Sequence, residues 1–196
     1  MRSPFAPHRR ALIAAAIIVI VALAVLLAMG RPPICTCGTV QLWYGDINAS
    51  GNSQHLSDWY TPSHIIHGMI FYALGWLLFG RLGLGAPPSR RYSYTLAVLL
   101  EAAWEVIENT PFVIDRYRSV TVNFGYSGDS VINSLADIGW MSLGFFLAMK
   151  LPVRVTLVLA IIMELIAGYA VRDNLTLNVI MLIYPVDAIA QWQGHG

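Results

Sequence analysis

Ionisable and amide side chains recur at helical spacing in three apolar stretches of this chain. The three sets are His64 with His67; Glu101, Glu105 and Glu108; and Asp129, Asn133 and Asp137. Each spacing fits one face of a helix with about 3.6 residues per turn. Ionisable groups cost free energy in hydrocarbon and normally face a cavity or a partner. The pattern therefore predicts that three helices turn polar faces toward a common cavity.

Imidazole and carboxylate groups in such a cavity support two kinds of chemistry. His67 with Glu105 or Glu108 is a pair for general acid and base catalysis. The same groups, with His64 and Asp129, would also form an oxygen and imidazole shell for zinc, manganese or iron. The spacing lacks the HExxH pattern of zinc proteases and the Glu-x-x-His pattern of ferritin-like sites. A divalent metal cofactor and a metal-free acid and base pair therefore stay open as alternatives.

The glutamates of the second set need counter-charge, because three adjacent carboxylates cannot all be ionised in a low dielectric without a cation, a proton or an arginine. Arg116 and Arg118, in the polar segment that follows, could fold over them or bind the anionic part of a ligand. The candidates for acid, base, metal-ligand or orienting roles are His64, His67, Glu105, Glu108, Asp129 and Asn133. The candidates for substrate binding are Arg116, Arg118, Glu101 and Asp137.

The elements that position these groups are long apolar stretches. Residues 11–29 are uninterrupted apolar side chains, about 28 Å as a helix, which is close to the thickness of a hydrocarbon core. This run exceeds a usual signal-peptide core and lacks a good cleavage site, so we interpret it as an uncleaved first span. Further spans are predicted at residues 63–80, 92–110, 130–149 and 153–170.

Residues 175–190 are a weaker sixth candidate, because Pro185 would kink a helix there and Asp187 lies inside it. This segment could span, re-enter or lie at the interface. With 57% hydrophobic and 12% charged residues, the chain is predicted to be a single all-α, polytopic transmembrane helix bundle of five to six spans over residues 1–196. A net charge of +1 and the lack of a basic run or phosphate-binding loop argue against a nucleic-acid partner.

The distribution of basic residues predicts the orientation. An N-terminus in the cytoplasm places eight of the 12 lysine and arginine residues on the cytoplasmic side, as the positive-inside rule favours. The predicted location is therefore a bacterial inner membrane, with segments 30–61 and 111–129 on the periplasmic side. All three polar sets then lie in or near the outer half of the membrane, with Glu101 and Asp137 as the floor of the cavity.

Cys35 and Cys37 lie in the first of these outer segments. Because one residue separates them, a mutual disulfide would be a tight ring. The simplest interpretation is that they are reduced or paired with another chain, and a metal site here would need further ligands. The sequence leaves the state of the two cysteines open.

Residues 63–72 (SHIIHGMIFY), 101–109 (EAAWEVIEN) and 128–137 (GDSVINSLAD) carry a resemblance to known proteins. In this order they resemble a family of bacterial integral membrane proteins known as domain of unknown function 2585, over nearly the whole chain. More loosely, they are similar to VanZ-like membrane proteins, which have a histidine near the start of one span, an acidic residue late in the next and an Asp-x-x-x-Asn pair opening another.

In the VanZ-like comparison, the matching polar positions are His67, Glu105 or Glu108, Arg118, Asp129 and Asn133. This chain has Glu108-Asn109 where the VanZ-like pattern usually has glutamine after its acidic residue. VanZ-like proteins are associated with glycopeptide resistance and the cell envelope. The resemblance therefore implies an envelope role without naming a reaction.

Three hypotheses follow for the function. The first is an envelope enzyme or binding protein with membrane lipids as partners, whose outer cavity engages a lipid head group or a lipid-linked intermediate. The second is a proton- or cation-coupled transporter, which predicts polar groups continuing to the inner face, where only Asp187 extends the path. The third is a membrane scaffold without catalytic activity.

Overall fold

The computed structural model describes residues 4–84, 87–122 and 125–194, and every regular element in these ranges is helical. The elements in chain order are α1 (Arg9–Ala28), α2 (Thr61–Gly75), its wider continuation η1 (Trp76–Arg81), the short 3-10 helix η2 (Pro87–Tyr92), α3 (Ser93–Glu108), α4 (Pro111–Val120), α5 (Val131–Lys150), α6 (Val153–Val171), α7 (Leu175–Ile183) and α8 (Asp187–Gln193). The predicted all-α class is confirmed.

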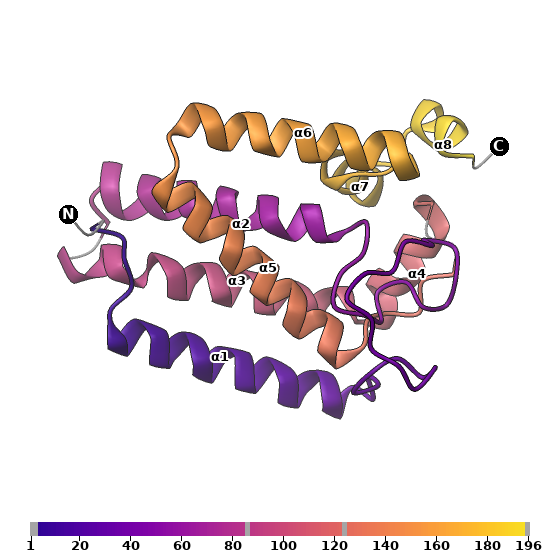
Figure 1. Cartoon of the computed structure of the whole chain (residues 1–196), viewed down its shortest axis with the longest axis horizontal. Helices are drawn as coiled ribbons and strands as arrows, with labels where there is room; N and C mark the ends of the chain where they lie inside the picture. Colours follow the sequence, from indigo (N-terminus) through magenta and orange to yellow (C-terminus); the bar gives the residue numbers. More distant parts are fainter. Residues whose placement is uncertain (1–3, 85–86, 123–124, 195–196) are drawn as a thin grey trace.

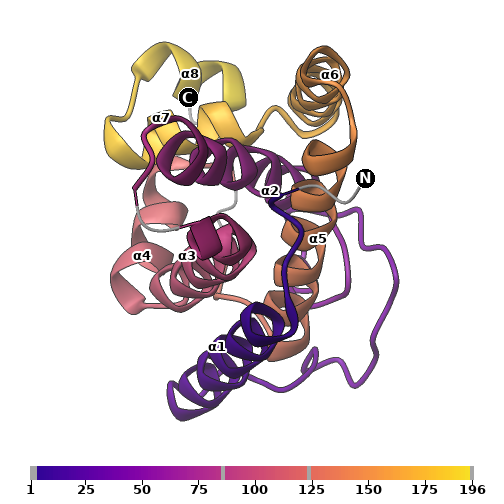
Figure 2. The same ribbon diagram turned by 90° about the vertical axis from the view of Figure 1, so that its left-hand side faces the viewer.

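Five long helices lie lengthwise in one bundle, while the short helices α4, α7 and α8 gather at one end. Figure 1 shows α1, α2, α3, α5 and α6 side by side, with α4, α7, α8 and the segment between α1 and α2 at the same end. In the turned view, α2, α3 and α5 form the centre of the bundle, with α1 on one side and α6 on the other (Figure 2). The two segments predicted to share one side of the membrane therefore share one end of the bundle.

Within the described ranges, four helices are long and apolar enough to cross a membrane: Arg9–Ala28, Thr61–Arg81, Val131–Lys150 and Val153–Val171. The stretch predicted as a span at residues 92–110 forms α3, which has 16 residues and is shorter than the roughly 20 residues of a typical crossing helix. It nevertheless packs within the bundle, between α1 and α2 (Figure 2).

The segment at residues 175–190 does not form one helix. Pro185 lacks a backbone N–H and disfavours helical geometry in the residue before it, and the backbone of Tyr184 is extended where α7 ends. The result is the two short helices α7 and α8, of which α7 is about 13 Å long. Glu164 of α6 holds the start of α7 by accepting the backbone N–H groups of Leu175 and Thr176, each at 3.0 Å.

Two glycines allow α2 and α5 to approach each other closely. A Cβ atom on Gly68 would overlap the backbone of Met141 and Phe145, and a Cβ atom on Gly144 would overlap the backbone of Ile65. Small residues at helix contacts permit such close packing of backbones. This contact holds the histidines of α2 at a fixed distance from the carboxylates of α5.

The segment before α2 is bound to the first half of α5 by hydrogen bonds. Trp140 Nε1 donates to the carbonyl of Leu56 at 2.8 Å, and Asn133 Nδ2 donates to the carbonyl of His55 at 2.8 Å. His55 is 1% exposed, and burial lowers the pKa of its imidazole. These contacts bring residues 53–58 over the end of the bundle, where they help to enclose a cavity.

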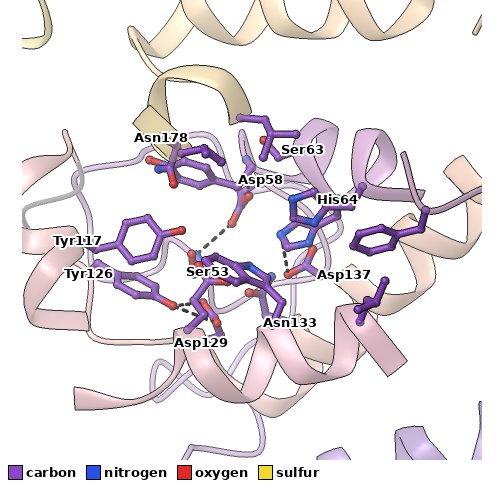
Figure 3. A pocket seen from close by; sticks show the side chains of 18 residues that line it. Ser53, Asp58, Ser63, His64, Tyr117, Tyr126, Asp129, Asn133, Asp137 and Asn178 are labelled. Carbon is purple, nitrogen blue, oxygen red and sulfur yellow. Dashed lines mark hydrogen bonds and ion pairs between the residues drawn. The ribbon is translucent and has the colours of Figure 1, made fainter. Parts of the chain in front are cut away.

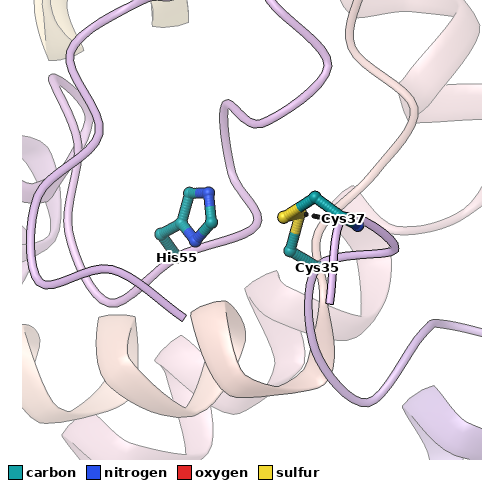
Figure 4. A group of neighbouring side chains, drawn as sticks. All are labelled: Cys35, Cys37 and His55. Carbon is teal, nitrogen blue, oxygen red and sulfur yellow. Dashed lines mark hydrogen bonds between the residues drawn. A yellow bond between two sulfur atoms is a disulfide. The ribbon is translucent and has the colours of Figure 1, made fainter. Parts of the chain in front are cut away.

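Cys35 and Cys37 form a disulfide with each other, with their Cα atoms 5.1 Å apart, in place of the reduced or intermolecularly paired state considered from the sequence (Figure 4). The turn between them brings the Cα atoms within the usual range for a disulfide, about 4.4–6.8 Å. His55 lies nearby. Because the sulfur atoms are bonded to each other, this group offers no thiolate to a metal.

Candidate functional site

A cavity of about 300 Å³ lies where the polar faces of α2, α3 and α5 meet the short helices. Figure 3 shows side chains from these helices, from α4 and α7, and from the segment before α2 around one space. Its polar and aromatic lining includes Ser53, Asp58, Tyr60, Ser63, His64, His67, Trp104, Glu108, Tyr117, Tyr126, Asp129, Asn133, Asp137 and Asn178. The structure thus brings together the three sets that the sequence placed on separate helices.

Both histidines of α2 are bonded to one carboxylate of α3. Nδ1 of His64 lies 2.6 Å from Oε1 of Glu101, and Nδ1 of His67 lies 3.0 Å from Oε2. Glu101 is fully buried. When this carboxylate is ionised it only accepts, so the proton of each neutral imidazole is on Nδ1 and Nε2 is left as an acceptor. Glu101 therefore orients two imidazoles that line the cavity.

Asp137 and Glu105 lie on either side of His64. Nε2 of His64 is 3.8 Å from Oδ2 of Asp137, and its Nδ1 is 3.6 Å from Oε1 of Glu105. Asp137 lines the cavity, whereas Glu105 is 1% exposed and lies behind the lining. Neither oxygen of Glu105 has a hydrogen-bond partner among the described residues.

Asp129, just before α5, is enclosed by hydrogen-bond donors. Asn109 Nδ2 donates to its Oδ2 at 2.6 Å. The Tyr126 hydroxyl donates to the same carboxylate at 3.0 Å, as Figure 3 shows. Arg31 donates through Nε to the backbone carbonyl of Asp129 at 2.9 Å. Burial raises the pKa of Asp129 to about 6, while the donors and the charge of Arg31 act in the opposite direction. This carboxyl group can therefore hold or release a proton near neutral pH.

Two tyrosines pack against each other on the same wall of the cavity. The rings of Tyr117 and Tyr126 meet edge to face with centroids 5.2 Å apart, and Tyr117 is hydrogen-bonded to Glu108. Burial raises the pKa of both phenols well above the usual value. They therefore stay protonated and act as donors toward the carboxylates.

A second set of polar side chains closes the opposite side of the cavity. Burial raises the pKa of Asp58, and the backbone N–H groups of Ser53 and Tyr60 donate to its carboxylate. The Tyr60 hydroxyl donates to Asp173 at 3.3 Å, and Asn178 Nδ2 donates to the same carboxylate at 3.2 Å. These contacts link the start of α2 to α7.

The predicted substrate-binding arginines bind backbone carbonyls rather than the carboxylates of the cavity. Arg116 Nε donates to the carbonyl of Leu182 at 3.0 Å, and Arg118 Nε donates to the carbonyl of Tyr126 at 2.5 Å. Arg118 also pairs with Asp115 at 3.7 Å. Neither arginine is part of the cavity lining. The guanidinium near the cluster is instead that of Arg31, which lies against Gly128.

Several residues of the site could not be identified from the sequence, because they do not follow a helical spacing. Arg31, Asp58 and Tyr126 belong to irregular segments, whose paths the periodicity of the helices does not predict. Asn109 carried a usable signal, since it ends α3 directly after Glu108 and continues the polar face.

Fold and site together define a class: a helical bundle of membrane-type helices that encloses carboxylate, imidazole and phenol groups at one end. Within this class, the chain belongs to the family described as "Protein of unknown function (DUF2585)", whose sequence profile matches residues 26–195. The resemblance to that family is therefore confirmed, while the looser resemblance to VanZ-like proteins stays a prediction.

Curated relatives extend over most of the chain. A UPF0314 protein of Novosphingobium aromaticivorans is 55% identical over 172 residues, which cover 88% of this chain and 86% of the relative. A UPF0314 protein of Sinorhizobium fredii is 58% identical over 165 residues, which cover 84% of this chain and 81% of the relative. One of Sphingopyxis alaskensis is 51% identical, with 94% and 95% covered. No solved structure matches the chain.

Proposed function

We propose that this protein is an enzyme of the bacterial inner membrane that hydrolyses or transfers the head group of a lipid or lipid-linked intermediate on the periplasmic side. The observation that carries the proposal is the pair of imidazoles held by Glu101, with hydrogen bonds of 2.6 and 3.0 Å from His64 and His67. A carboxylate that fixes a histidine through Nδ1 leaves Nε2 as a general base.

The proposed reaction divides its proton transfers between His67 and Asp129. Nε2 of His67 takes a proton from water, whose oxygen forms a bond to the carbonyl carbon or the phosphorus atom of the head-group ester. The bond from that atom to the leaving oxygen breaks, and Asp129 supplies the proton for the leaving group. The pKa of about 6 suits Asp129 to this acid role, because catalytic groups work best when their pKa lies near the working pH.

The packing supports a cavity that opens at the outer end of the bundle and is closed toward the inner end. Beyond His67, the centre of the bundle is filled by the buried apolar side chains of Ala97, Val98, Met141 and Phe145, packed against Phe71. Asp187, the one inward polar residue that the transport hypothesis used, starts α8, at the end of the bundle where α4 and α7 lie (Figure 1). Residues of α4 and α7 line the cavity. These features favour an enzyme or binding site over a transport path.

The proposed membrane arrangement has five crossings, with α3 accompanying the four longer helices and the N-terminus in the cytoplasm. The five helices alternate in direction along the bundle (Figure 1), and apolar side chains of α1 and α6, including Ile20, Val21, Ile161 and Leu165, are exposed where lipid would cover them. The cavity then faces the outer leaflet.

The experiment is a comparison of membrane lipids in a bacterium whose gene for this protein is deleted. The deletion should cause one class of lipid or lipid-linked intermediate to accumulate, and the wild-type gene should reverse this. His67→Ala should fail to reverse it at normal membrane abundance, whereas Asp115→Asn, a change of an exposed carboxylate of α4, should succeed. Unchanged lipids in the deletion strain, or full rescue by His67→Ala, would contradict the proposal.

A further inference from the structure

Glu105 is a buried carboxylate without a partner. Its side chain is 1% exposed, and neither of its oxygens accepts a hydrogen bond from any residue in the described ranges. An ionised carboxylate in such a place carries a large desolvation cost. A proton would remove the charge but would leave both the new O–H group and the carbonyl oxygen unbonded, so protonation alone does not satisfy the group.

The groups around Glu105 are arranged as ligands of an ion. One ligand atom each from His64, Glu105 and Asp137 lie within 4.8 Å of one another. Nε2 of His64 and Oδ2 of Asp137 are 3.8 Å apart. Bonds of about 2.0–2.2 Å to a metal place two ligands of one ion roughly 3–4 Å apart. The atoms of His64 and Asp137 already have this spacing, whereas Glu105, whose Oε1 lies 3.6 Å from Nδ1 of His64, must move toward Nε2 for all three to reach one ion.

The hydrogen bond from His64 to Glu101 prepares the imidazole for this role. Because Nδ1 donates to Glu101, the lone pair of Nε2 is free on the side of Asp137. Histidines that bind metals usually donate their other ring N–H to a carboxylate or a carbonyl, which fixes the ring and increases its basicity. Glu101 is in the place of that second carboxylate.

Three other groups of potential ligands are less available. Both oxygens of Glu101 already accept from His64 and His67, so the set His64, His67 and Glu101 is occupied by hydrogen bonds. In the set Glu105, Glu108 and Asp129, Asp129 accepts from Asn109 and Tyr126, and Glu108 is bonded to Tyr117. The third set contains the disulfide sulfurs of Cys35 and Cys37.

We propose that His64, Glu105 and Asp137 bind one divalent transition-metal ion, for which Zn²⁺ and Mn²⁺ are the probes. A mixed imidazole and carboxylate set suits these ions better than Ca²⁺ or Mg²⁺, which prefer oxygen ligands alone. Three protein ligands leave a position open for water or substrate. His64 and Asp137 line the cavity, so this position faces the space where the proposed function places its substrate.

The inference goes beyond the proposed function and is tested on the purified full chain in detergent, stripped with a chelator and dialysed against Zn²⁺ or Mn²⁺. Wild type should retain about one ion per chain, and its unfolding temperature should rise on addition of the ion. Glu105→Gln and Asp137→Asn should each lower the affinity at least about tenfold. The thermal shift should disappear in both variants.

The matched control is Asp129→Asn, which removes a carboxylate from the neighbouring set and should retain the ion. Glu105→Gln removes an unpaired charge and should unfold at or above the temperature of ion-free wild type, which shows that it folds. The proposal is overturned if folded wild type retains less than about a tenth of an ion per chain. It is also overturned if Asp129→Asn loses the ion while Asp137→Asn keeps it.

Ion binding and lipid chemistry give separate results. A bound ion without any lipid change in the deletion strain supports this site and contradicts the proposed function. A lipid change that needs His67, in a protein that binds no ion, overturns this site and supports the proposed function.

Discussion

His64 of α2 and Glu101 of α3 are joined by a hydrogen bond of 2.6 Å between Nδ1 and Oε1. The same carboxylate accepts from His67 one turn later. One buried side chain therefore fixes the tautomer and the direction of two imidazoles, and it does so without itself lining the cavity. In the proposed function, Glu101 is thus a positioning residue rather than a catalytic one.

Replacement of Glu101 should separate orientation from folding. Glu101→Gln keeps the size and one acceptor but turns an N–H₂ group toward an imidazole, so we expect roughly 10- to 100-fold lower rescue of the lipid phenotype. Glu101→Ala should in addition lower stability by about 1–3 kcal/mol, because the buried imidazole of His64 and the half-buried one of His67 lose their partner. Rescue assays and thermal unfolding in detergent measure the two effects. The pH dependence of rescue should also shift in Glu101→Gln, and a purely structural role of Glu101 would not cause such a shift.

The close contact of α2 and α5 predicts a strong effect of one methyl group. Gly144→Ala would place a Cβ atom against the backbone of Ile65 and should cost about 1–3 kcal/mol, because the helices must separate. Gly139→Ala on the same helix is the control, since nothing lies within 4 Å of its Cβ position. Alanine favours a helix over glycine by about 1 kcal/mol, so Gly139→Ala should be neutral or stabilising. Equal unfolding temperatures for the two variants would contradict the close contact between α2 and α5.

Stability should decrease as the pH rises through the pKa of Asp129. Its folded-state pKa of about 6 lies above the ordinary value of 3.8, so the folded chain binds the proton more tightly than the unfolded chain. The resulting stability is fully present below about pH 4 and is lost as the pH rises through about 6. The unfolding temperature of wild type should therefore fall between about pH 5 and pH 7.

The side chain of Asp129→Asn cannot titrate, so the unfolding temperature of this variant should fall less over the same pH range. Asp173, whose pKa is also raised by burial to about 6, should contribute a further share, which Asp173→Asn removes. Asp115→Asn, at an exposed position, should behave like wild type. The same pH dependence in Asp129→Asn and in wild type would contradict the assignment to this carboxyl group.

The proposed five crossings place the two chain ends on opposite sides of the membrane. A reporter that is active only in the periplasm, such as alkaline phosphatase, should be active when fused after α8. It should be inactive when fused ahead of α1. An active C-terminal fusion agrees with α7 and α8 lying at the same end as segment 30–61 (Figure 1). An inactive C-terminal fusion, or an active N-terminal one, would reverse the proposed orientation of the cavity.

The helices and their polar faces were predictable because the spacing of Glu101, Glu105 and Glu108 alone fixes a common face. The meeting of these faces was also predictable, since helices that alternate in direction bring the start of α2, the end of α3 and the start of α5 to one end. The break at Pro185 into two helices was signalled by the residue itself. The length of α3 was not, because its predicted limits included Tyr92 and Asn109, which cap α3, and Thr110, which caps α4.

Residues outside the helices were not predictable from periodicity. Nothing in the sequence around Arg31 indicates that its guanidinium lies against Gly128 and holds Asp129, whereas Arg118, close to the glutamates in sequence, turns toward Tyr126. The Cys35–Cys37 disulfide depends on a local turn that brings the two Cα atoms to 5.1 Å. Such arrangements follow from the packing of irregular segments against helices, which no helical pattern describes.

Release of a lipid head group by the purified protein is the most direct test of the proposed function. Wild-type protein, reconstituted with lipid extract from the deletion strain, should convert the accumulated lipid to a product that mass spectrometry identifies. His67→Ala and Glu101→Gln should each lose most of this conversion, and Asp115→Asn should retain it. Conversion that is equal in wild type and His67→Ala, or absent in wild type that is folded and supplied with Zn²⁺ and Mn²⁺, would contradict the account.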